Sequence, residues 1–209
     1  MRFDEENHAE AVAAELGIEL PDALRGAVRK RKMEHVAGRH CAIQALRTVL
    51  GGFDAAIARA PDRSPQWPSG MVGSITHARG FASAAVARAG AVRSIGIDTE
   101  VLLTESALSS IISTIGAAGD PRPFGLCMPD THYYALLFSA KESVFKCLYP
   151  LVQRMFWFED ARVTISTATR TFRALLVTDL HPDFRAGFSV EGQYEFSGEY
   201  VHTGLMLHA

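Results

Sequence analysis

The chain has 209 residues, of which 48% are hydrophobic and 21% are charged, and its formal net charge is -2 at pH 7. This length and composition predict a globular protein, either one compact unit or two small halves that share a core. The nearly balanced charge argues against a protein that binds nucleic acid or a membrane surface through broad electrostatic attraction.

Three further absences set the expected compartment. No run of the sequence approaches the ~18 apolar residues of a membrane span, and the acidic N-terminus does not resemble a signal peptide. The chain has an odd number of cysteines, and they lie far apart: Cys41, Cys127 and Cys147. They therefore have neither the spacing of a metal site nor the pattern of a disulfide framework. We therefore expect a cytoplasmic protein with reduced thiols and no membrane span.

The first part of the chain is expected to be helical. After a short helix around residues 5–16, a longer helix is predicted from Pro21 to Leu50, because Pro is a start signal and the Gly-Gly pair at 51–52 is a stop signal. Within this helix, Arg31, His35 and Arg39 are spaced by four positions, so their side chains share one face. These residues form either a solvated basic face or an anion site, for which the bidentate fork of arginine is suited.

Residues 51–70 read as an ordered loop without regular structure, because the segment is rich in Pro and Gly. Arg63 lies within it, either as a solvent-exposed residue or as a clamp on a ligand. Three strands are then predicted at 71–77, 81–87 and 92–100, with the second strand buried.

Two acids end the third of these strands. Side chains alternate faces along a strand, so Asp98 and Glu100 project to the same side. Neighbouring carboxylates repel each other unless a cation neutralises them, and a hard divalent ion such as Mg²⁺ prefers such oxygen ligands. The alternative is an exposed strand end that carries two acids.

The rest of the chain alternates helices and strands. A helix capped by Thr104 is expected over 104–115, followed by an irregular loop whose apolar residues are candidates for contact with a partner: Phe124, Leu126 and Met128. A second helix should run from Asp130 or Thr131 to about Tyr149, where Pro150 ends it. Four β segments follow, at 161–165, 171–178, 188–190 and 199–207.

The second helix contains a cluster of charged residues. Glu142 and Lys146 are four positions apart and lie on one face, whereas Lys141 points elsewhere. Without further context, this pair is a surface ion pair on an amphipathic helix. The whole pattern predicts an α/β (α+β) protein made of two α/β halves, residues 1–102 and 103–209.

Several segments together resemble the three signature motifs of the 4′-phosphopantetheinyl transferases: GSITH at 73–77, GIDTE at 96–100 and FSAKESVFK at 138–146. RKMEHVAGRHCA at 31–42 and WPSG at 67–70 are similar to the larger branch, which includes the enterobactin synthetase component. The resemblance implies two similar halves packed as a pseudo-dimer in one chain, with the active site between them. It also implies transfer of the phosphopantetheine arm of coenzyme A to a serine of an apo acyl or peptidyl carrier protein, which leaves 3′,5′-ADP.

The resemblance also implies roles for individual residues. Asp98, Glu100 and Glu142 would bind Mg²⁺, and Glu142, Lys146 and Asp98 would form the catalytic centre. The coenzyme A contacts would come from a larger set: Arg31, Arg39, Arg63, Thr76, His77, Asp98, Lys141 and Lys146. Physical chemistry agrees, because coenzyme A brings a pyrophosphate and a 3′-phosphate on which several cations should converge.

The implied setting is a cytoplasmic monomer that serves siderophore, nonribosomal peptide or polyketide synthesis. Two other classes stay open at this point. One is a homologue without catalytic activity that binds only coenzyme A or a carrier protein. The other is a magnesium-dependent phosphohydrolase that releases inorganic phosphate and needs no carrier protein.

Overall fold

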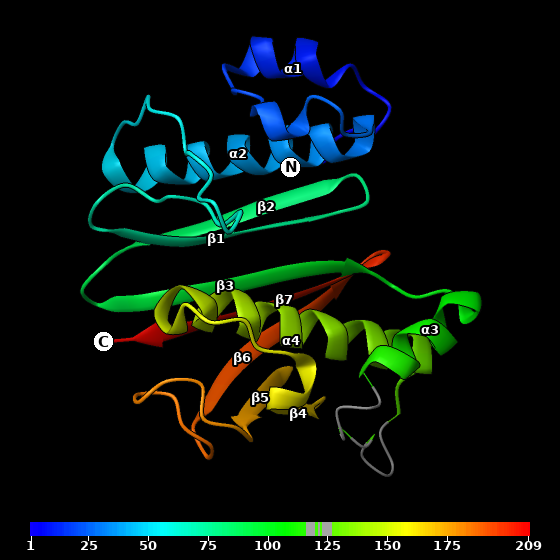
Figure 1. Cartoon of the computed structure of the whole chain (residues 1–209). Helices are drawn as coiled ribbons and strands as arrows, with labels where there is room; N and C mark the ends of the chain where they lie inside the picture. The colour runs from blue at the N-terminus through cyan, green and yellow to red at the C-terminus, as the bar shows by residue number, and fades with distance from the viewer. Residues whose placement is uncertain (116–119, 121, 123–126) are drawn as a thin grey trace. The chain divides into compact units, whose positions relative to one another are not determined.

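The computed structural model describes the chain apart from residues 116–119, 121 and 123–126 (Figure 1). The chain forms two compact units, Met1–Arg93 together with Ala209, and Ser94–His208. This division falls inside a strand rather than at residues 102 and 103. Both units combine helices with β strands, so the predicted α/β class is confirmed. The similarity of the two halves stays a prediction.

The helices of the first unit are α1 (Ala9–Leu16) and α2 (Arg29–Leu50). The predicted start at Pro21 is wrong, because Pro21 precedes only a 3₁₀ turn at Asp22–Leu24. Between that turn and α2, the backbone of Val28 is extended (φ -59°, ψ 151°), which interrupts the helical hydrogen bonds. The predicted stop is confirmed, because Gly51 ends α2 in the left-handed conformation (φ 75°) that glycine adopts without strain.

The hairpin of the first unit consists of β1 (Met71–Ala78) and β2 (Phe81–Arg88), which pair antiparallel. β2 was predicted to be buried, but most of its side chains are half-buried. α2 lies along this hairpin (Figure 1), and the lack of a side chain at Gly38 permits the approach, since a Cβ there would lie 2.9 Å from Ile75. This packing places the end of β1 beside the start of α2, where Arg31 Nη1 lies 3.0 Å from His77 Nε2.

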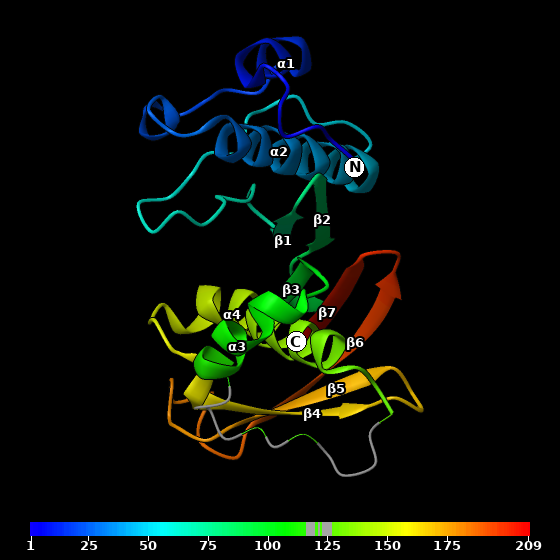
Figure 2. The ribbon, with the colours of Figure 1, turned by 90° about the vertical axis from the view of Figure 1, so that its right-hand side faces the viewer.

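The second unit is built on a five-stranded sheet of order β3-β7-β6-β5-β4. Its strands are β3 (Val92–Val101), β4 (Ala161–Ser166), β5 (Thr171–Leu176), β6 (Ser189–Ser197) and β7 (Tyr200–His208). All five positions were expected from the sequence, although β6 is much longer than predicted. Figure 2 shows α4 lying across this sheet, with α3 beside it.

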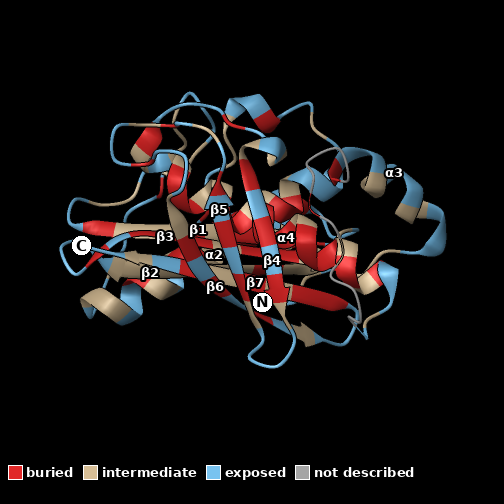
Figure 3. Ribbon diagram, turned by 90° about the horizontal axis from the view of Figure 1, so that it is seen from below, coloured by how far each residue is buried: buried red, intermediate tan, exposed pale blue. Residues whose placement is uncertain are grey.

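The α-helices in the described part of the second unit are α3 (Glu105–Ile115), which begins directly after Thr104, and α4 (Asp130–Val152). Pro150 was predicted to end α4, but it lies inside the last turn, and Gln153 ends the helix with φ 50°. The turn survives because proline removes only one helical hydrogen bond, and Gln153 N–H still bonds to Tyr149 O at 2.8 Å. The inner face of α4 is buried, as Figure 3 shows.

β3 is held unusually close to α4. A Cβ at Gly96 would collide with the carbonyl oxygen of Ser143, so this position requires glycine. Beside it, Ser94 Oγ donates a hydrogen bond to Cys147 O at 2.6 Å. The acid-bearing end of β3 therefore faces the segment of α4 that carries Glu142 and Lys146.

Two other expectations concern the surface. Of the apolar residues predicted to contact a partner, Phe124 and Leu126 lie outside the described residues, and Met128 packs partly buried against the core of the second unit. Among the described helices, none is both long enough and apolar enough to span a membrane.

Candidate functional site

The second unit contains a buried acid, Asp98, that contacts polar and charged side chains of other elements. Asp98 is 3% exposed, and Lys146 Nζ donates to its Oδ1 at 2.5 Å. Ser139 Oγ donates to its Oδ2 at 2.8 Å and lies 2.9 Å from Thr203 Oγ1. Lys146 thus pairs with an acid on a different element, so the interpretation of a purely local surface pair with Glu142 is wrong.

Glu100 and Glu142 belong to the same electrostatic cluster. The pKa of Glu100 is raised to about 8, mainly by burial and also by the negative charges of Asp98 and Glu142, while Lys146 opposes the shift. Burial also raises the pKa of Glu142, with Asp98 adding to the effect and Lys146 opposing it. The sign of these shifts follows first from burial, and among the charged groups that contribute to them Lys146 is the one cation beside three carboxylates.

The cluster has the donor chemistry of a site for a hard cation. Carboxylate oxygens that crowd together without enough positive charge are the ligands that Mg²⁺ prefers. In the described part of the chain, however, no three Asp, Glu, His or Cys side chains already form a metal site. Both oxygens of Asp98 have partners, Lys146 and Ser139, so the acids lie near one another without forming one coordination sphere.

The raised pKa of Glu100 predicts how cation binding depends on pH. The ion requires the charged form, so below pH ~8 each pH unit should weaken Mg²⁺ binding by up to about tenfold. Without the ion, the folded pKa of about 8 lies above the ordinary value of 4.5. Glu100 therefore contributes stability fully below pH ~4.5, and this contribution is lost as the pH rises through about 8.

The measurement is the Mg²⁺-induced rise in Tm between pH 6.5 and 8.5. Glu100→Gln should bind the ion more weakly and should flatten the pH dependence. An equally steep dependence in Glu100→Gln would contradict the assignment of the titration to this residue.

Lys141 does not take the place that the resemblance implies. Its side chain is 2% exposed and forms an ion pair with Asp120. Its ammonium also donates to Phe158 O at 2.7 Å and to Ala161 O at 2.8 Å. These contacts use all three of its N–H groups, so the expected contact with a phosphate is wrong in this structure.

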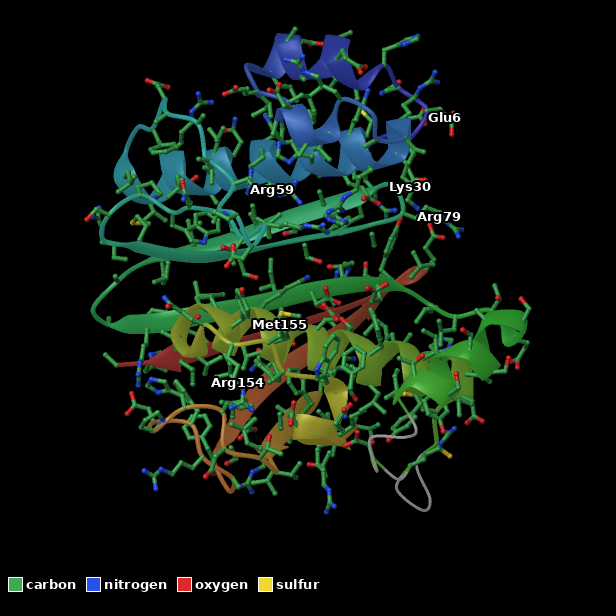
Figure 4. The ribbon with its side chains drawn as sticks, in the orientation of Figure 1. Glu6, Lys30, Arg59, Arg79, Arg154 and Met155 are labelled. Carbon is green, nitrogen blue, oxygen red and sulfur yellow. The ribbon has the colours of Figure 1, made fainter. Side chains whose placement is uncertain are left out.

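An apolar cavity of about 330 Å³ lies beside the acid cluster. Glu142 lines it together with aromatic and apolar side chains from α4 and the segment that follows: Phe138, Phe145, Met155, Phe156 and Trp157. Trp157 and Met155 remain 64% and 54% exposed, and Figure 4 marks Met155 in the segment after α4. The cavity suits a long ligand with few charges.

The first unit contains a separate cluster around His77. Arg31 Nη1 lies 3.0 Å from His77 Nε2 and donates to Glu34 Oε2 at 3.1 Å. Thr76, the preceding residue of β1, is 1% exposed. The structure therefore brings Arg31 and His77 together, as predicted for a phosphate site, and adds the buried acid Glu34.

A second basic group lies further along α2. Arg39 is 8% exposed, and its Nε has no hydrogen-bond partner. It lines a cavity of about 240 Å³ together with His35 and Arg59. Burial, helped by the charge of Arg59, lowers the pKa of Arg39 to about 10, and burial followed by the charge of Arg39 lowers the pKa of His35 to about 4. Positive charge is thus concentrated around this cavity, on Arg39 and Arg59.

The structure identifies Arg59 rather than Arg63 as the loop residue beside Arg39. Figure 4 shows Arg59 in the loop between α2 and β1. Arg63 is exposed in a turn, with φ 76° and its N–H bonded to Ala60 O at 2.9 Å. No sequence motif distinguished Arg59, since the segment lacks any periodicity that would assign its side chains to a face. A role for Arg63 stays a prediction.

The fold and these clusters define an α/β protein with basic groups in one unit and a buried acid cluster in the other, as in proteins that handle phosphorylated ligands. The model of the 4′-phosphopantetheinyl transferase N-terminal domain matches residues 20–87, and that of the 4′-phosphopantetheinyl transferase superfamily matches residues 94–203. The chain belongs to the 4′-phosphopantetheinyl transferase superfamily.

Curated relatives agree with this assignment. The chain is 41% identical over 142 residues to the 4′-phosphopantetheinyl transferase PptT of Mycobacterium tuberculosis, covering 67% of this chain and 61% of that protein. It is 39% identical over 166 residues to the 4′-phosphopantetheinyl transferase Npt of Nocardia iowensis, covering 73% and 71%. It is 36% identical over 162 residues to enterobactin synthase component D of Salmonella typhimurium, covering 74% and 64%. The chain thus spans about three fifths of the length of the mycobacterial relative.

Proposed function

We propose that this protein transfers the 4′-phosphopantetheine group of coenzyme A to a serine of an apo acyl or peptidyl carrier protein and releases 3′,5′-ADP. The observation that carries the proposal is the cluster of Asp98, Glu100, Glu142 and Lys146, which lies within the region matched by the superfamily model. The curated relatives named as phosphopantetheinyl transferases support the same reaction.

Each unit carries features suited to one part of coenzyme A. The anionic groups of coenzyme A, a pyrophosphate and a 3′-phosphate, would bind the cationic side chains of the first unit: Arg31, Arg39, Arg59 and His77. Arg39 is suited to this role because its buried Nε lacks a partner and guanidinium binds phosphate in a bidentate manner. The uncharged pantetheine arm would lie in the apolar cavity beside Glu142.

Asp98, Glu100 and Glu142 would hold Mg²⁺, which when bound neutralises charge on the phosphate oxygens of the leaving group. The serine oxygen of the carrier protein attacks phosphorus, the bond to 3′,5′-ADP breaks, and the serine proton moves to Glu142. A carboxylate whose pKa is raised by burial is a suitable acceptor for that proton. Lys146, whose ammonium contacts Asp98, would stabilise the negative charge that develops on the phosphate oxygens.

The direct test is incubation with fluorescent coenzyme A, Mg²⁺ and a panel of apo carrier proteins from siderophore, nonribosomal peptide and polyketide systems. We expect covalent label on the carrier serine, loss of labelling with EDTA, and a monomer in gel filtration. Binding of coenzyme A without label transfer would indicate a homologue without catalytic activity. Release of inorganic phosphate without a carrier protein would indicate a phosphohydrolase.

A second prediction concerns the 3′-phosphate. Because a charge-assisted hydrogen bond contributes about 1.5–3 kcal/mol, His77→Ala should weaken coenzyme A binding by roughly 10- to 150-fold. Binding of 3′-dephospho-coenzyme A should change little. An equal loss for both ligands, measured by calorimetry, would show that His77 does not read this phosphate.

A further inference from the structure

Glu34 is the unexpected member of the His77 cluster. It lies in the basic segment that opens α2, yet it is 8% exposed, and Arg31 Nη1 donates to its Oε2. His77 Nδ1 lies 3.7 Å from the same oxygen. A buried carboxylate beside a proposed phosphate site opposes the phosphate by its charge, so its presence requires an explanation.

The contacts determine which ring nitrogen of His77 carries hydrogen. Guanidinium has only N–H donors, so the Nε2 that contacts Arg31 Nη1 at 3.0 Å must be the acceptor. The hydrogen of the neutral ring therefore sits on Nδ1, the nitrogen that faces Glu34. If the hydrogen moved to Nε2, a lone pair would face the Glu34 carboxylate, so Glu34 disfavours the other neutral form.

A bound phosphate reverses what Nε2 must do. A phosphate dianion only accepts hydrogen bonds, so an accepting Nε2 cannot bind it. Since Glu34 keeps hydrogen on Nδ1, Nε2 can become a donor only by taking a proton from solvent, which makes the ring an imidazolium. The ordinary histidine pKa of ~6.5 allows this change when two anions flank the ring.

We propose that Glu34 is a positioning residue that couples binding of the 3′-phosphate to uptake of one proton by His77. In the empty site it holds Arg31 and sets the hydrogen of His77 on Nδ1, and in the filled site it stabilises the imidazolium between itself and the phosphate. The inference rests on the proposed function, because coenzyme A supplies the phosphate.

The surrounding charges are consistent with this assignment. α2 presents Arg31 and Glu34 to the ring, and on β2 the partner of His77 is the uncharged Ala82. Arg79 follows in the turn after β1, where Figure 4 marks it. From the N-terminal segment, Glu5 accepts the N–H of Gly80 and pairs with Lys30. Glu34 is thus a carboxylate that the ring nitrogen Nδ1 itself faces, at 3.7 Å.

The test is calorimetry at pH 7.5 in buffers of different ionisation enthalpy, with coenzyme A and 3′-dephospho-coenzyme A. The difference between the two ligands isolates protons linked to the 3′-phosphate from those linked to Mg²⁺. We expect wild type to take up roughly half to one proton more with coenzyme A. In Glu34→Gln this excess should largely disappear, and coenzyme A affinity should fall about tenfold, while dephospho-coenzyme A affinity stays unchanged.

Glu10→Gln is the matched control, because Glu10 lies on α1 and pairs with Lys32 of α2, so the change also removes a carboxylate that pairs with a cation near the start of α2. An excess uptake in Glu34→Gln equal to wild type would overturn the inference, and so would an equal loss of affinity for both ligands, which indicates a structural role.

Nitrogen NMR of the free protein provides a test that does not depend on coenzyme A. It should show His77 with hydrogen on Nδ1 in wild type and a mixture of both neutral forms in Glu34→Gln. Hydrogen on Nε2 in wild type would overturn the inference. Failure of wild type to bind coenzyme A, with the Nδ1 form present, would instead count against the proposed function.

Discussion

Glu142→Gln should bind coenzyme A with Mg²⁺ and yet transfer phosphopantetheine ~10²–10⁴-fold more slowly than wild type. The amide keeps an oxygen that can still ligate the ion, but it cannot accept the serine proton. Glu142 lines the apolar cavity, and burial raises its pKa toward the range of an effective base. Single-turnover transfer to an apo carrier protein at saturating Mg²⁺ measures the chemical step separately from binding.

Asp98→Ala is the comparison for this experiment. It removes the acid that both Lys146 and Ser139 contact, so it should weaken Mg²⁺-dependent binding of coenzyme A itself. If Glu142→Gln turned over at nearly the wild-type rate, Glu142 would not be the base, and water or another group would deprotonate the serine.

Lys141→Met should destabilise the protein by ~3–5 kcal/mol, because it leaves the Asp120 carboxylate buried without its cation. The side chains of Lys141 and Asp120 are 2% and 0% exposed. Asp120 Oδ1 also accepts the N–H of Val163 at 2.6 Å, so the pair joins α4, β4 and the segment before α4. Urea denaturation measures the loss, and Asp120→Leu combined with Lys141→Met should recover much of it.

The control for Lys141 is Lys30→Met, which removes a half-exposed partner of Glu5 and should cost no more than about 1 kcal/mol. The phosphate contact implied by the family resemblance makes the opposite forecast. In that case the Lys141→Met variant would be as stable as wild type but would bind coenzyme A more weakly. Urea denaturation and coenzyme A binding together therefore discriminate between a structural role and a phosphate contact.

Residue spacing together with helix-end signals predicted the elements that carry the site. The spacing of Asp98 and Glu100 places both on one face of β3, and the helix around Glu142 and Lys146 lies within α4. Gly51 was a reliable stop because a left-handed residue there favours glycine. The start of α2 was not predictable from Pro21, because a 3₁₀ turn and a helix begin with the same local signal.

Only the tertiary structure decided which charges meet. The neighbour of Glu142 along the chain, Lys141, turns inward to Asp120, whereas Lys146 reaches Asp98 on β3. Arg59 joins Arg39 from an irregular loop, where no period assigns side chains to a face. The two ion pairs of Lys141 and Lys146 depend on which buried charges find partners during packing, since an unpaired buried charge costs several kcal/mol. Residue spacing along one chain segment does not contain that information.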